Sequence, residues 1–143
     1  IGSAKMSQSY AKTLGMHFAL IEKRRFAPNQ TEVNHLIGNL DSLDVLIIDD
    51  MVDTAGTTVS AADAAIAKGA NSVTVVATHG VLSGPAVQRL NESVIDKLIV
   101  TDTILIPEEK QIEKIETVSA AGLFAEAISR VHDGESLSAL FEF

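Results

Sequence analysis

The apolar residues of this chain fall into short runs that have the length of β-strands. Three of the runs are rich in β-branched residues and do not alternate with polar ones, which is typical of strands covered on both faces of a parallel sheet. These three are Val45–Ile48, Val73–Thr78 and Leu98–Val100. Met16–Ile21 and Ile115–Val118 are expected to be two further short strands.

Segments with apolar positions three or four residues apart lie beside these runs and predict helices. The predicted helices are Ser3–Leu14 with Gly15 as its stop, residues 59–66 with Gly69 as their stop, a helix that starts at Ser83–Pro85, and a helix capped by Ser119 that runs to Val131 before Gly134. Glu22–Glu32 is polar and basic and contains Pro28, so a loop or projecting arm is expected there. Strands that alternate with helices predict an α/β fold around a mostly parallel sheet with right-handed crossovers.

Composition narrows the class of protein. A chain of 143 residues, 46% of them hydrophobic, is expected to form one globular domain, residues 1–143. Eleven basic against nineteen acidic residues give a net charge of −8, which argues against nonspecific binding to nucleic acid or to an anionic membrane. There is no cysteine, which fits the cytoplasm. Because the chain opens with Ile1 directly in a helical pattern, we expect it to be part of a longer protein.

An acidic pair follows the first buried run. Asp49 and Asp50 repel each other, so they need a cationic or hydroxylic partner. The hydroxyls of a sugar diol can donate to both carboxylates, and Mg²⁺ with its waters is the other natural partner. Thr54–Thr58 then form a small-residue loop at a helix start, where free N–H groups and the helix dipole favour an anion.

A diol beside a phosphate monoester describes ribose 5-phosphate. The alternative for this stretch is a strand end with solvated acids and a tight turn. No lysine follows the loop, so it is not a nucleotide P-loop, and there is no Gly-x-Gly-x-x-Gly pattern.

The stretch Asp49–Thr57 resembles the phosphoribosyl-pyrophosphate binding motif shared by type I phosphoribosyltransferases and ribose-phosphate pyrophosphokinases. That resemblance implies a three-layer α/β fold, with helices on both faces of the sheet. It also implies that Asp49 and Asp50 hold the ribose hydroxyls, directly or through a metal ion. The implied contacts to the 5′-phosphate come from Asp53, Thr54, Ala55, Gly56 and Thr57.

Two flanking stretches resemble the pyrophosphokinases in particular. Ala19–Arg25 looks like their flexible catalytic arm, in which Lys23 and Arg25 would stabilise the transferring group. By pattern alone, three adjacent cations indicate a solvated loop. Ala77–Ala86 is similar to a signature of these synthetases, although a lone histidine after a strand, here His79, is more often structural.

Two later stretches extend the resemblance to the end of the chain. Val100–Ile104 matches the next strand end of the pyrophosphokinases, and His132–Phe141 resembles their C-terminus. In phosphate-activated members, the serines that match Ser136 and Ser138 contribute to an allosteric site for ADP or phosphate. A capped helix end with an apolar tail is the alternative for those serines.

The resemblance implies the C-terminal half of a ribose-phosphate pyrophosphokinase whose N-terminal domain is absent. Such an enzyme of nucleotide biosynthesis uses Mg²⁺ and transfers the diphosphate of ATP to the 1-hydroxyl of ribose 5-phosphate. ADP and phosphate are implied as effectors, and a homo-oligomer, a hexamer, as the assembly. Because the ATP site lies mostly in the missing half, we expect this chain alone to be inactive. A type I phosphoribosyltransferase and a non-catalytic, synthetase-associated regulatory protein remain alternatives.

Overall fold

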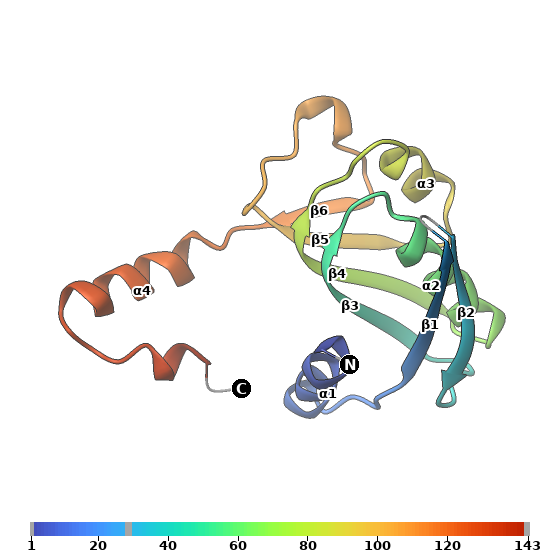
Figure 1. The fold of residues 1–143 in the computed structure, drawn as a ribbon, viewed down its shortest axis with the longest axis horizontal. Coiled ribbons are helices and arrows are strands. Elements are labelled where there is room, and N and C mark those ends of the chain that lie inside the picture. The colour runs from blue at the N-terminus through green and yellow to red at the C-terminus, as the bar shows by residue number, and fades with distance from the viewer. Residues whose placement is uncertain (1, 28–29, 142–143) are drawn as a thin grey trace.

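The fold is an α/β sheet with an N-terminal helix and hairpin and a separate C-terminal helix (Figure 1). The computed structural model describes residues 2–27 and 30–141, with side chains described for residues 7–19 and 38–141. Helix α1 (Gly2–Leu14) leads into the hairpin of β1 (Leu20–Ala27) and β2 (Gln30–Ile37). The elements that follow are β3 (Asp44–Val52), α2 (Gly56–Ala67), β4 (Ser72–Gly80), α3 (Ala86–Glu92), β5 (Lys97–Thr101), β6 (Ile115–Val118) and α4 (Ala121–His132), with 3-10 turns at Glu108–Lys110 and Ser138–Phe141.

The sheet of β3, β4, β5 and β6 is parallel throughout and follows the order of the chain. Its register aligns Ile47 with Val75, Val75 with Leu98, and Leu98 with Ile115. These strands are the predicted buried runs, so the predicted α/β fold with a parallel sheet is confirmed. Helix α1 lies alongside β3, the edge strand.

The core lies between one face of the sheet and the helices α2 and α3. Alternate residues of β4, Val73 and Val75 among them, are fully buried, as the period of a strand requires. The helices meet them with Ala62 and Ala65 of α2 and with Leu90 of α3. Small residues on α2 allow its backbone to lie close to the sheet, which fixes where its first turn stands.

Two predictions for the N-terminal region were wrong in part. Glu22–Glu32 was expected to be a loop or projecting arm; it is not a loop, because β1 pairs with β2 in an antiparallel hairpin, separate from the main sheet, that matches Glu22 with His35 and Arg25 with Thr31. The strand predicted at Met16–Ile21 begins only at Leu20. Cross-strand hydrogen bonds satisfy the backbone of a hairpin without an apolar run, so the polar sequence concealed it. The hairpin lies beside α2 through β2 (Figure 1).

The start of α4 also differs from the prediction. Its N-cap residue is Ala120, one residue after the predicted Ser119, and the side chain of Ala120 makes no capping hydrogen bond. The Ser119 hydroxyl still accepts the N–H of Ala121, the first residue of α4, at 3.2 Å, and it donates to Asp102 Oδ2 at 2.5 Å. Asp102 therefore fixes the chain where it leaves β6.

Helix α4 lies apart from the sheet (Figure 1). Its apolar side chains are largely exposed, and they are Leu123, Phe124, Ile128 and Val131. A shallow hollow on this face is lined by Phe124, Ala127, Ile128, Val131 and His132. Within the described residues, none of the helices has the length and hydropathy needed to cross a bilayer.

Candidate functional site at the carboxyl edge of the sheet

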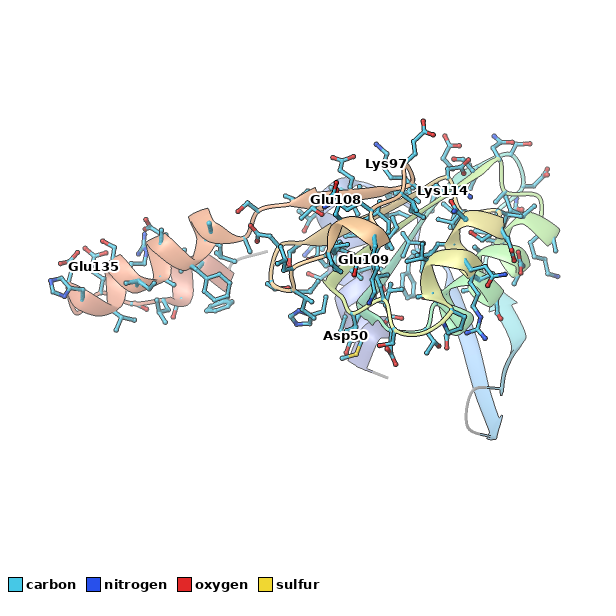
Figure 2. The ribbon with its side chains drawn as sticks, turned by 90° about the horizontal axis from the view of Figure 1, so that it is seen from above. Asp50, Lys97, Glu108, Glu109, Lys114 and Glu135 are labelled. Carbon is cyan, nitrogen blue, oxygen red and sulfur yellow. The ribbon has the colours of Figure 1, made fainter. Side chains whose placement is uncertain are left out.

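The acidic pair lies inside β3 and not beyond its end. The strand continues past Ile48 to Val52, which pairs with Gly80 of β4. The ladder pairs Asp49 with Ala77 and Met51 with His79, so both acids lie within the paired part of the strand. Asp49 Oδ1 accepts the N–H of Asp50 at 3.0 Å, and Asp50 Oδ1 accepts the N–H of Met51 at 2.8 Å. Asp50 is exposed and projects from the side of the molecule opposite Lys97 (Figure 2).

The loop after β3 presents a row of backbone N–H groups. Ala55 has φ 60° and ψ 0°, a left-handed conformation unusual for a residue with a side chain, and is 3% exposed. It is also the N-cap of α2, whose first turn receives no hydrogen bond from a capping side chain. Among the described residues, the N–H groups of residues 53–58 have no hydrogen-bond acceptor. These donors are therefore available to an anionic ligand.

The segment that follows β4 donates backbone hydrogen bonds to the start of this loop. The N–H groups of Val81 and Leu82 donate to the carbonyl of Val52 at 3.0 and 3.1 Å. The N–H of Ser83 donates to the carbonyl of Asp53 at 3.0 Å. The predicted signature that contains His79 thus lies against the predicted phosphate loop, because both follow neighbouring parallel strands.

Arg89 completes these contacts, although no sequence motif singled it out. Its Nη1 donates to the carbonyl of Thr54 at 2.9 Å. Arg89 stands on α3, three residues beyond the signature at Ala77–Ala86. A cation on the helix after that signature was the only available signal, and it is weak without the structure.

His79 is tied to the end of the neighbouring strand. Its Nδ1 lies 2.8 Å from the Thr103 hydroxyl, which lies 2.8 Å from the Thr101 hydroxyl. The Thr101 hydroxyl donates to the carbonyl of Thr78 at 2.7 Å. The structure therefore brings the stretches Ala77–Ala86 and Val100–Ile104 together, as expected for adjacent strand ends of one sheet.

Asp102, at the carboxyl edge of the sheet, has a structural role. Its carboxylate accepts two hydrogen bonds, one from the Ser119 hydroxyl and one from the Ala120 N–H at 2.8 Å. These hydrogen bonds favour the charged form and hold the pKa of Asp102 below its ordinary value of 3.8. The acid thereby joins the end of β5 to the start of α4.

The remaining predicted residues lie elsewhere. Lys23 and Arg25 belong to β1, with backbone partners Val33 and Thr31, and their side chains lie outside the described residues. Ser136 and Ser138 are joined by a hydroxyl–hydroxyl hydrogen bond of 3.1 Å. Both serines follow Glu135 in the C-terminal segment, well away from Asp50 (Figure 2). The structure therefore does not bring the serines to the acidic pair.

The acidic pair fits a partial magnesium site. No three His, Cys, Asp or Glu side chains gather into a metal-binding group anywhere in the described part of the chain. Mg²⁺ typically uses one or two protein carboxylates and completes its octahedron with waters and substrate phosphates. Asp49 and Asp50 could supply the protein share of such a shell.

Comparison with known proteins was decisive for the family. A family model described as the phosphoribosyl synthetase-associated domain matches residues 25–142. This chain belongs to that family. The match includes the acidic pair, the phosphate loop and α4 but only part of β1.

Ribose-phosphate pyrophosphokinases that are similar to this chain are longer than it. It is 49% identical over 140 residues to the ribose-phosphate pyrophosphokinase of Caldanaerobacter subterraneus subsp. tengcongensis. It is 46% identical over 142 residues to that of Chlorobaculum tepidum and 46% identical over 140 residues to that of Bacillus subtilis. The alignments cover 98–99% of this chain but 44% of each relative.

A solved structure agrees with this assignment. The phosphoribosylpyrophosphate synthetase from Mycobacterium smegmatis superposes with a TM-score of 0.82 and is 32% identical in sequence. The match covers 94% of this chain and 43% of that one. The fold is therefore that of a phosphoribosylpyrophosphate synthetase over less than half of its length.

Proposed function

We propose that this chain is the part of a ribose-phosphate pyrophosphokinase that binds ribose 5-phosphate. The parent enzyme would transfer the diphosphate of ATP to the 1-hydroxyl of the sugar phosphate. The carrying observation is that Asp49 and Asp50 lie on β3, the strand that leads into a loop whose N–H groups, at residues 53–58, have no acceptor among the described residues. The names of the relatives support the same reaction.

Each part of the site has a role in this proposal. Asp49 and Asp50 accept hydrogen bonds from the ribose hydroxyls, and the loop from Asp53 to Thr57 donates N–H and hydroxyl groups to the 5′-phosphate. Holding the acceptor hydroxyl in place lowers the barrier by proximity. Mg²⁺, when bound at the acidic pair, would offset charge on the phosphates.

The rest of the reaction depends on groups outside the described side chains. Lys23 and Arg25 would neutralise charge on the transferring diphosphate, in the manner of other phosphoryl-transfer sites. ATP would bind mainly to the part of the enzyme that this chain lacks. We extend the proposal to ADP or phosphate as effectors at Ser136 and Ser138, to a homo-oligomeric, hexameric assembly, and to a cytoplasmic location.

Calorimetric titration of this chain with ribose 5-phosphate and with ribose, both with Mg²⁺, tests the binding proposal. Ribose 5-phosphate should bind, and ribose should bind at least about tenfold more weakly because the loop then has no anion. Asp50→Asn should lower the affinity for both ligands. Asp63→Asn, at an exposed acid of α2, is the matched control and should change neither affinity. Equal affinities for the two sugars would contradict the proposal.

A second assay distinguishes the enzyme classes. The full-length protein should form AMP from ATP and ribose 5-phosphate, whereas this chain alone should form none. Release of diphosphate from phosphoribosyl pyrophosphate on addition of a nucleobase would instead indicate a phosphoribosyltransferase. Binding of the sugar phosphate without either reaction in the full-length protein would indicate a regulatory relative.

A further inference from the structure

Three successive carbonyl groups, at the end of β3 and the start of the phosphate loop, accept hydrogen bonds from one neighbouring segment. The carbonyls of Val52 and Asp53 accept backbone N–H groups from residues 81–83. The carbonyl of Thr54 accepts Nη1 of Arg89, the only side chain among these donors. All of the donors lie between residues 81 and 89, so this segment braces one side of the loop.

Planarity of the peptide bond determines the direction of the N–H groups in this loop. In a trans peptide the C=O of one residue and the N–H of the next point in opposite directions. Because the carbonyls of residues 52–54 face the brace, the N–H groups of Asp53, Thr54 and Ala55 face away from it. None of these three N–H groups has an acceptor among the described residues. They extend the row formed by the first N–H groups of α2.

The Thr54–Ala55 peptide depends most on the brace. Ala55 holds the left-handed conformation that turns the loop into α2, and such a conformation is costly for a residue with a Cβ. The hydrogen bond from Arg89 fixes the orientation of the peptide just before that turn. Without it, the carbonyl of Thr54 has no donor among the described residues.

Gly56 makes room for this contact. A Cβ at Gly56 would lie 3.1 Å from Arg89 Nη1, closer than a carbon and a nitrogen ordinarily approach. No carboxylate in the described part of the chain forms an ion pair with Arg89. The guanidinium charge therefore stands unneutralised beside the positive end of α2, a placement that favours an anion in the loop.

We infer that Arg89 is a positioning residue for the phosphate-binding loop. It acts on the ligand through the Thr54 carbonyl, by keeping the N–H groups of residues 53–55 turned toward the 5′-phosphate. This inference rests on the proposed function, since it assigns a new residue to the proposed ribose 5-phosphate site.

The first test measures ribose 5-phosphate affinity by calorimetry for the unaltered chain, Arg89→Ala and Arg89→Lys. Arg89→Ala should bind about tenfold more weakly, because a charge-assisted hydrogen bond is lost. Arg89→Lys should recover part of the affinity, since lysine also donates to a carbonyl. The controls are Gln88→Ala on the same helix and Lys97→Ala, which removes a cation from the amino end of β5. Both should bind like the unaltered chain.

A second test separates positioning from general stability. Inorganic phosphate should shift the backbone amide signals of Thr54 to Thr57 in ¹H–¹⁵N spectra of the unaltered chain, and these shifts should shrink in folded Arg89→Ala. Gly56→Ala should also weaken binding by displacing Nη1, and much of its effect should disappear when Arg89 is already alanine.

The outcomes distinguish the inference from the proposed function. If the unaltered chain does not bind ribose 5-phosphate, both are overturned. If it binds and folded Arg89→Ala binds equally well, only the role of Arg89 is overturned. Additive effects of Gly56→Ala and Arg89→Ala would likewise contradict the contact between them.

Discussion

Single residues at the carboxyl edge of the sheet have structural roles that cannot be recognised from the residues next to them in sequence. Asp102 lies in a stretch that matches a strand end of the pyrophosphokinases, yet its carboxylate holds Ser119 and Ala120. Ala55 adopts a conformation usual for glycine and opens α2 without a capping side chain. Both residues serve the geometry of the backbone around the site.

The lowered pKa of Asp102 predicts a pH dependence of the β6–α4 junction. Because the folded form prefers the carboxylate, this stabilisation is present above the unfolded pKa of 3.8 and is lost as the pH falls through the lower folded value. Titration of the carboxyl ¹³C signal should give a pKa below 3.8, and Ser119→Ala should raise it toward 3.8. An unchanged pKa in Ser119→Ala would contradict the assigned cause.

At the scale of elements, α2 and α3 differ from α4 in what they bury. Leu90 of α3 is 0% exposed and belongs to the core, whereas Ile128 of α4 is 68% exposed. Helices α2 and α3 hold the phosphate loop and the segment from Val81 to Arg89 against the sheet. The apolar face of α4 contributes little to that packing.

This difference predicts unequal costs for similar substitutions. Leu90→Ala should lower the free energy of unfolding by about 2–5 kcal/mol, because it leaves a cavity in the core. Ile128→Ala should change it by less than about 0.5 kcal/mol, as expected at an exposed position. Chemical denaturation of the three proteins measures both values. A loss above 2 kcal/mol in Ile128→Ala would show that α4 packs against the fold in solution.

At the scale of the whole molecule, the chain spans 44% of the curated relatives it matches. The parallel sheet presents the acidic pair and the phosphate loop at one edge, which forms the acceptor side of the proposed reaction. The hairpin of β1 and β2 stands outside this sheet and carries Lys23. Lys23 and the acidic pair therefore belong to two different sheets of this chain.

Lys23→Ala in the full-length protein tests that arrangement. If Lys23 neutralises charge on the transferring diphosphate, kcat should fall by about 10²–10³-fold while KM for ribose 5-phosphate changes little. Lys110→Ala, in the turn before β6, serves as the control and should retain activity. A rise in KM with kcat unchanged would assign Lys23 to sugar binding instead.

The sequence by itself determined the parallel sheet and predicted the ligand class of the site. Short apolar runs rich in β-branched residues are typical of parallel strands, and a short motif holds its chemistry within a few residues. Tertiary structure alone decided that β1 and β2 pair, that β3 runs through the acids to Val52, and that Arg89 reaches Thr54 from 35 residues away. Such contacts depend on how whole elements pack, because hydrogen bonds between distant residues leave no period in the sequence.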